Sequence, residues 1–214
     1  MIFRDLGRLA YRDAWAVQEE AHDQVANGGE EQLLFVEHSP VITFGRRPGG
    51  EKNLVASRER LAELGVDLVE SDRGGDVTFH GPGQIVAYPI IRLIDHHLSV
   101  GGYVRRLEEI VMATLAEFSI VGQKDESAIG VWVNDGDTLA KICALGVRIR
   151  KGISLHGIAL NVDTDLNFFN LIIPCGLTSR PVTSMRKLLG DHCPEMQTVR
   201  DALRRQFTKS LTQF

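Results

Sequence analysis

The segment RGGDVTFHGPGQ, residues 73–84, holds four glycines and one proline in twelve positions. Glycine carries a high entropic cost in regular elements and proline lacks a backbone N–H, so no helix or strand is expected to run right through it. The segment therefore divides the chain, and the strand-like run IVAYPIIRL (85–93) follows it directly. Pro89 within that run favours an edge strand or a bulge.

On either side of this break, short strands and helices are mixed. Strand patterns occur at 2–8, 33–38, 41–45, 66–70, 129–134, 139–149 and 153–162, and helical patterns occur at 11–27, 56–65, 101–118, 183–190 and 195–212. The composition of 46–53 predicts a loop. Because the elements do not alternate as in repeated βαβ units, the sequence predicts an α+β fold with a mixed, largely antiparallel sheet. No repeat or long polar linker interrupts the 214 residues, so one domain over 1–214 is expected.

Charge and cysteine usage narrow the protein class. The net charge of −4 argues against a nucleic-acid partner, since phosphate binding needs a local excess of basic residues. Three cysteines do not indicate a disulfide framework and fit a reducing compartment. The N-terminus carries charges where a secretion signal has an apolar core, and no apolar run reaches the roughly 18 residues of a membrane span. We expect a soluble, cytoplasmic protein without a membrane partner, and a chain of this length needs no metal to fold.

Cys175 stands between Pro174 and Gly176, at a backbone break. Proline fixes the backbone before it and glycine leaves the thiol unshielded, so this cysteine could be an exposed, fixed nucleophile. The alternative is a buried thiol acting as a small hydrophobe, and local sequence leaves both open. Cys143, within an apolar strand, fits the buried alternative, and Cys193 lies in a polar turn with no predicted role.

A nucleophilic thiol also needs a base or a nearby cation, because the pKa of free cysteine is about 8.5. The candidates are His80, His156 and Lys141, the last at the start of an otherwise apolar strand. A lysine at a strand end is more often solvated. A lysine turned inward and partly desolvated would have a lowered pKa and could act as a base. The sequence leaves its direction open.

The glycines of 73–84 also suggest a binding role, although the segment matches neither nucleotide-loop motif. Glycine lets a ligand approach the backbone, whose amides can hold a carbonyl or carboxylate oxygen. The alternative is a tight structural turn, but four glycines beside charged and polar side chains favour binding. Gly157 interrupts the strand at 153–162 and marks another place of close approach.

Three basic residues, Arg148, Arg150 and Lys151, lie near the end of the strand at 139–149. A solvated strand face is the favoured interpretation. The alternative is a basic docking strip for an acidic protein partner.

A resemblance to one family extends in order over residues 42–185, about two thirds of the chain. The segments that carry it are ITFGRR and NLV within 42–55, RGGDVTFHGPGQIVAYPI, KICALGVRIRKGISLHGIALNV, NFFNLIIPCGL and VTSM. Together they resemble the lipoyl(octanoyl) transferase family. HGPGQ, the KIxALGxR pattern and the cysteine of PCG form a specific combination.

The resemblance implies the fold of the biotin and lipoate protein ligases. It implies transfer of an octanoyl group from octanoyl-acyl carrier protein, through a cysteine thioester, to one lysine of a lipoyl domain. Such domains belong to the 2-oxoacid dehydrogenase complexes and the glycine cleavage H protein. Exchange of one thioester for another needs no ATP, so no cofactor and no metal are expected. The family further implies a monomer.

Residue by residue, the resemblance makes Cys175 the nucleophile and Lys141 the residue that lowers the pKa of its thiol. The acyl-binding residues that it implies are Arg73, Gly74, Gly75, Asp76, Val77, Thr78, Phe79, His80, Ala144, Leu145, Gly146, Gly157, Ile158 and Ala159. Two positions depart from the family pattern: Cys143, where a small residue such as alanine is common, and Leu155, where an aromatic residue is frequent. Cys143 is two positions from Lys141 on a strand, so both side chains are expected on one face.

Three rival functions stay open at this stage. An ATP-dependent lipoate–protein ligase would activate a free acid and need no cysteine. A non-catalytic carrier-binding protein would keep the glycine-rich pocket and lack the nucleophile. A cysteine hydrolase would let water resolve the acyl-enzyme.

Overall fold

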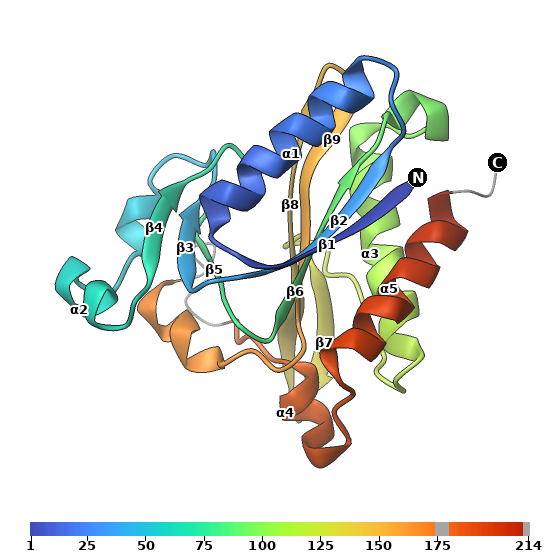
Figure 1. Ribbon diagram of the computed structural model, residues 1–214. Helices are drawn as coiled ribbons and strands as arrows, with labels where there is room; N and C mark the ends of the chain where they lie inside the picture. The colour runs from blue at the N-terminus through green and yellow to red at the C-terminus, as the bar shows by residue number, and fades with distance from the viewer. Residues whose placement is uncertain (174–179, 212–214) are drawn as a thin grey trace.

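The computed structural model describes residues 1–173 and 180–211 (Figure 1). The strands are β1 (Ile2–Leu9), β2 (Gln32–His38), β3 (Val41–Phe44), β4 (Asp67–Glu70), β5 (Thr78–His80), β6 (Gln84–Ile90), β7 (Val131–Asp135), β8 (Thr138–Arg150) and β9 (Ile153–Asn161). The α-helices are α1 (Tyr11–Ala26), α2 (Arg58–Glu63), α3 (Val100–Ala116), α4 (Met185–Leu189) and α5 (Met196–Leu211). No helix within these residues is long and apolar enough to cross a lipid bilayer.

The strands form two sheets, both mixed. The larger has six strands in the order β1-β2-β6-β9-β8-β7, in which β1 and β2 are parallel and the other neighbours antiparallel. The smaller has the order β4-β3-β5, with β3 parallel to β4 and antiparallel to β5. The predicted α+β class with a mixed, largely antiparallel sheet is confirmed.

Helices cover both faces of the larger sheet (Figure 1). Helix α1 packs against one face through Ala14, Ala21 and Val25, while α3 and α5 cover the other. The apolar period of α3 explains its place, because Leu107 and Leu115 share one helical face and are both fully buried. Ser99 caps this helix by accepting a hydrogen bond from the Gly102 amide, 3.1 Å away.

Two expectations about local structure need correction. The run 46–53, expected to be a loop, contains a short 3-10 helix at Gly50–Asn53. Strand β6 is an interior strand, so the edge position suggested by Pro89 is wrong. Pro89 lies beyond the register of β6 with β9, which ends at Ala87, and there the Ser154 hydroxyl donates to the Pro89 carbonyl at 2.7 Å. A missing N–H therefore removes no ladder bond on that side.

Candidate functional site

The glycine-rich segment lies across strand β8 of the larger sheet. The Gly74 amide donates to the Val147 carbonyl at 3.0 Å. A Cβ atom on Gly146 would lie 2.9 Å from the Gly74 carbonyl oxygen, so any side chain at Gly146 would push the segment away. Glycine at both positions lets two backbones meet directly and forms one side of a cavity.

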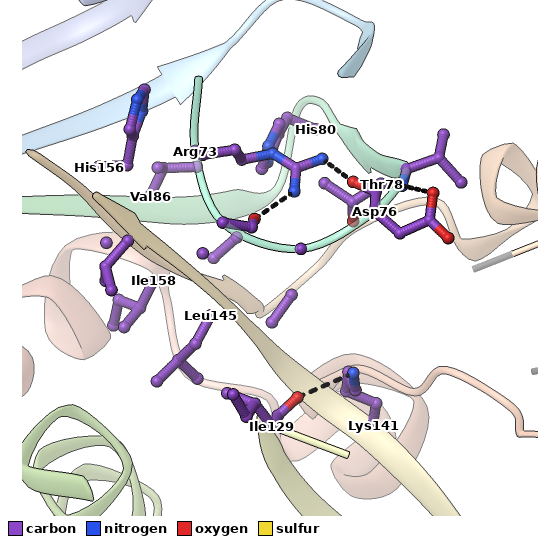
Figure 2. A pocket seen from close by; sticks show the side chains of 18 of the residues that line it. Arg73, Asp76, Thr78, His80, Val86, Ile129, Lys141, Leu145, His156 and Ile158 are labelled. Atoms are coloured by element: carbon purple, nitrogen blue, oxygen red, sulfur yellow. Dashed lines mark hydrogen bonds between the residues drawn. The ribbon is translucent and has the colours of Figure 1, made fainter. Parts of the chain in front are cut away.

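Arg73 holds this segment in shape, as Figure 2 shows. Its guanidinium is buried and donates to the Thr43 carbonyl at 2.7 Å, the Gly74 carbonyl at 2.9 Å and the Asp76 carbonyl at 2.6 Å. The Asp76 carboxylate in turn accepts from the Val77 amide at 2.7 Å. These bonds use side chains to satisfy backbone groups that a glycine-rich segment cannot pair in a regular ladder.

A cavity of about 560 Å³ lies between this segment and strands β8 and β9. That volume is within the range of small-molecule sites, roughly 300–1,000 Å³. The described residues of the predicted acyl-binding set that line it are Arg73, Gly74, Gly75, Asp76, Val77, Thr78, His80, Ala144, Leu145, Gly146, Gly157, Ile158 and Ala159. The structure therefore brings together segments that are more than 60 positions apart in the sequence.

Phe79 is the one member of that set that points elsewhere. Side chains alternate along a strand, so Thr78 and His80 face the cavity while Phe79 faces the opposite side. Its ring is buried in the core and stacks on Phe168, with centroids 4.8 Å apart. Phe79 is therefore not among the residues that line the cavity.

Lys141 is half-buried and lines the cavity near its Ile129 end (Figure 2). Its ammonium donates to the Ile129 carbonyl at 3.1 Å and lies 4.7 Å from the centroid of the Trp132 ring. The side chain thus faces the cavity, while its hydrogen bond to Ile129 remains exposed to solvent. The backbone of Lys141 bonds on both sides of Val182, to Pro181 and Thr183, at distances of 2.9 Å. This joins Lys141 to the chain that follows residue 179. Cys175 lies outside the described residues.

Cys143 does not share the cavity face with Lys141, so that expectation is wrong. In the pairing of β7 with β8, Val131 lies opposite Cys143 and Trp132 opposite Lys141, which leaves Ile142 as an extra residue. Such a bulge breaks the alternation of side chains. Ile142 and Cys143 both enter the hydrophobic core, where burial raises the pKa of Cys143 to about 12. A thiol of that kind is a poor nucleophile.

The other end of the cavity carries polar and aromatic groups that the sequence did not single out. Tyr11 from α1 and Tyr88 from β6 both line it. The Tyr11 hydroxyl is 2.8 Å from the Ser71 hydroxyl, and the Tyr88 hydroxyl is 2.7 Å from Nε2 of His38. Tyr11 lies outside the segments that carry the family resemblance, whereas Tyr88 lies within RGGDVTFHGPGQIVAYPI but had no role assigned to it; the fold brings the two together. Within the described parts of the chain, no group of three or more His, Cys, Asp or Glu side chains is arranged to hold a metal ion.

Two of the candidate bases from the sequence, His80 and His156, also lie at this end. Burial lowers the pKa of both rings, to about 3 for His156. Nε2 of His156 is 2.6 Å from the Asp72 carboxylate, but Arg148 already neutralises that carboxylate in an ion pair. Both rings are therefore neutral at physiological pH.

A neighbouring buried histidine, His38, gives a testable pH dependence of stability. Burial lowers its pKa from 6.5 to about 4. As the pH falls from 6.5 to 4, the unfolded chain binds a proton that the folded protein rejects, so stability present above pH 6.5 is lost. Between pH 6.5 and pH 4, the free energy of unfolding of the His38→Gln variant should fall by about 3 kcal/mol less than that of the wild type. Urea denaturation at several pH values measures this. Exposed His192, changed to glutamine, is the control, and an unchanged pH slope in the His38 variant would contradict the assignment.

The basic residues at the end of β8 are largely neutralised. Arg148 pairs with Asp72, and Arg150 pairs with Glu19 at 2.5 Å. Acidic side chains of this protein therefore occupy the two arginines, which disfavours the alternative of a docking strip for an acidic partner.

Comparison with known proteins adds to this geometry. The model of the family described as Lipoyl protein ligase A/B catalytic domain matches residues 10–208. The octanoyltransferase of Nitratidesulfovibrio vulgaris (strain DP4) is 44% identical over 212 residues, covering 99% of this chain and 95% of that protein. That of Chloroflexus aggregans (strain MD-66 / DSM 9485) is 47% identical over 200 residues, covering 92% and 89%.

Among solved structures, one describes an archaeal lipoylation system from Thermoplasma acidophilum, a bi-partite lipoate protein ligase and its E2 lipoyl domain. It superposes with a TM-score of 0.78 at 18% identity, covering 99% of this chain and 83% of that one. At this identity the likeness concerns the fold, and it confirms the expected fold of the lipoate protein ligases.

Proposed function

Because this chain belongs to the lipoyl protein ligase A/B catalytic-domain family and is an acyltransferase related to octanoyltransferases, we propose that it moves octanoyl from acyl carrier protein to a lipoyl-domain lysine. The observation that supports this most is the cavity, which has an apolar wall, a glycine-rich rim and the ammonium of Lys141 at one end. The proposed acceptors are the lipoyl domains of 2-oxoacid dehydrogenase complexes and the glycine cleavage H protein.

The apolar wall fits a saturated acyl chain. Val86, Leu145 and Ile158 line the cavity beside Ala144 and Ala159. Burial of one methylene contributes about 0.8 kcal/mol, so burial of a whole octanoyl tail would contribute about 5 kcal/mol. The proposed acyl-binding residues are those of the predicted set that line the cavity, without Phe79.

In the first step, Lys141 in its neutral amine form takes the proton of the Cys175 thiol, and the sulfur attacks the carbonyl carbon of the octanoyl thioester. The bond from that carbon to the carrier sulfur breaks, and the carrier leaves as a thiol with the proton. One thioester replaces another, so the step is nearly neutral in energy and needs no ATP. Backbone amides near Cys175 and in the segment 73–80 would stabilise the oxyanion, each by about 3 kcal/mol.

In the second step, the neutral amine of the acceptor lysine attacks the carbonyl carbon of the acyl-enzyme. The bond from that carbon to the Cys175 sulfur breaks, and Cys175 leaves as a thiol with the proton that the amine gives up. The pKa of a lysine amine in water is about 10.4, so a base must take its proton before or during attack. Lys141 is proposed for this transfer too. The amide that forms is much more stable than a thioester, so the second step makes the overall reaction favourable. A covalent intermediate of this kind gives ping-pong kinetics.

Intact mass after mixing the protein with octanoyl-acyl carrier protein, without ATP, tests the proposal. We expect the mass to rise by one octanoyl group in the wild type and in Cys143→Ser, and not in Cys175→Ser. The Cys143 variant is the matched control because its thiol is buried in the core.

Each rival predicts a different result. No adduct in the wild type would favour the ATP-dependent ligase or the non-catalytic binder, and added ATP with free octanoate separates those two. Loss of the adduct in the Cys143 variant would show that Cys143, and not Cys175, is the nucleophile. Rapid release of octanoate without an acceptor would indicate a hydrolase. The catalytic domain is proposed to span 1–214 and to act as a monomer, which light scattering can test.

A further inference from the structure

Two neighbouring arginines, Arg46 and Arg47, stand exposed beside the cavity without a use in the mechanism above. Most arginines of the described chain hold a carboxylate, as Arg148, Arg150 and Arg186 do. Arg46 and Arg47 form no ion pair or side-chain hydrogen bond with any residue in 1–173 and 180–211. An unneutralised pair of guanidinium groups favours an anionic ligand.

The backbone beneath these arginines is fixed. The amides of Gly45, Arg46 and Arg47 donate to carbonyls of the glycine-rich segment at 3.0–3.1 Å: Gly45 to Asp76, Arg46 to Arg73 and Arg47 to Gly75. A Cβ atom on Gly45 would lie 2.4 Å from the Gly75 carbonyl oxygen, so the two backbones are in close contact. The main chain is held while both side chains stay available, an arrangement that lowers the entropic cost of binding.

The arginines border an open depression that adjoins the cavity. It has a volume of about 400 Å³ and is lined by Arg46, Arg47, Gly74, Gly75 and Val147. All of these except Arg46 also line the larger cavity, so the two spaces share a rim. The nearby Asp76 carboxylate is occupied by Asn53 at 2.8 Å and by the Val77 amide at 2.7 Å.

We propose that Arg46 and Arg47 bind the phosphodiester of the pantetheine arm that carries the octanoyl thioester on the donor. This inference rests on the proposed function, in which that thioester enters the cavity. The acyl chain would then lie inside, the arm would pass over the shared rim at Gly74 and Gly75, and its phosphate would reach the arginines outside. Guanidinium groups match phosphate in both charge and geometry.

The test compares two small donors that differ only in the phosphate, octanoyl-phosphopantetheine and octanoyl-pantetheine. In the wild type, kcat/KM for acyl transfer should be at least about tenfold higher with the phosphorylated donor, since a hydrogen bond to a charged group contributes about 1.5–3 kcal/mol. The double variant Arg46→Ala/Arg47→Ala should lose this preference, its kcat/KM with the phosphorylated donor falling to the value that it has with octanoyl-pantetheine. Arg58→Ala/Arg105→Ala removes the same charge from exposed positions outside both spaces and should keep the preference.

Three results would overturn the proposal. In the first, the wild type shows the same kcat/KM with both donors; in the second, the double variant loses the same factor in kcat/KM with both donors and so keeps the preference. In the third, the variant would lose activity only with the whole carrier protein, which would assign the arginines to an acidic protein surface.

Ligand-observed NMR measures the binding of non-acylated phosphopantetheine and pantetheine, and so tests the phosphate site independently of acyl transfer. Phosphate-dependent binding that disappears in the double variant supports the site even if the wild type transfers no acyl group, in which case the proposed function alone fails. Equal binding of both compounds overturns the site whatever the enzyme's activity. Equal thermal unfolding midpoints for all variants exclude misfolding as the cause.

Discussion

The Lys141→Ala variant is expected to lose between about 10²- and 10⁴-fold in kcat/KM for octanoyl transfer, the range that a positioned acid–base group supplies. The Nζ atom of Lys141 lies at the cavity, 3.1 Å from the Ile129 carbonyl oxygen; its neutral amine is the proposed proton acceptor, and alanine leaves none there. Steady-state transfer from octanoyl-acyl carrier protein to a lipoyl domain measures the loss. The acyl-enzyme should also form more slowly in intact-mass experiments.

A matched control and a rescue distinguish proton transfer from simple packing. Arg180 also lies over the Trp132 ring, 5.1 Å from its centroid, but pairs with Asp125 and is outside the cavity lining. Arg180→Ala should therefore cost much less activity than Lys141→Ala. A small primary amine added to the Lys141 variant should restore part of the rate, because it can carry the missing proton. Near-normal turnover of Lys141→Ala would remove this residue from the mechanism.

The Gly157→Ala variant is expected to lower the free energy of unfolding by at least about 3 kcal/mol, the scale of severe overpacking. A Cβ atom at this position would lie 2.1 Å from the Ala87 carbonyl oxygen and 2.9 Å from Cδ of Pro89. Both belong to β6, an interior strand that cannot withdraw without breaking its own pairing with β2. Urea denaturation measures the change.

Gly101→Ala is the comparison for that variant. Gly101 is exposed in α3, and the nearest atom to a Cβ there is the Arg105 guanidinium at 3.7 Å. Alanine favours a helix, so this change should be neutral or stabilise the protein by up to about 1 kcal/mol. If both glycine variants unfolded at the same urea concentration, close approach of the backbones at Gly157 would not be a source of strain.

Local patterns predicted the elements of this fold well, because the periods of strands and helices depend on near neighbours. The helical pattern at 101–118 corresponds to α3, and the pattern at 139–149 lies within β8. The edge position inferred from Pro89 failed for a non-local reason. Where the ladder of β6 with β9 ends, the Ser154 hydroxyl donates a hydrogen bond to the Pro89 carbonyl. The sequence near residue 89 does not indicate this contact.

The site was predictable where motifs carried it and not where the fold assembles it. Family segments indicated the residues around Gly74, Gly146 and Gly157, which the structure brings to one cavity. The contribution of Tyr11 depends on α1 packing against β9, a long-range contact without a motif. The bulge at Ile142, which separates Cys143 from Lys141, follows from the pairing of β7 with β8 rather than from the sequence of β8 alone.

Arg73 and Gly74, adjacent in the chain, tie the two sheets together: the arginine bonds to Thr43 of the smaller sheet and the glycine to Val147 of the larger. The cavity therefore exists only while the sheets are docked. By thermodynamic linkage, a ligand that fills the cavity stabilises the docking of the two sheets by RT ln(1 + [L]/Kd), where [L] is its free concentration and Kd its dissociation constant. Binding of the acyl chain and docking of the sheets are therefore coupled. Substitutions at Thr43, which bonds to Arg73 but is not in the cavity lining, would consequently alter acyl affinity without touching the acyl chain.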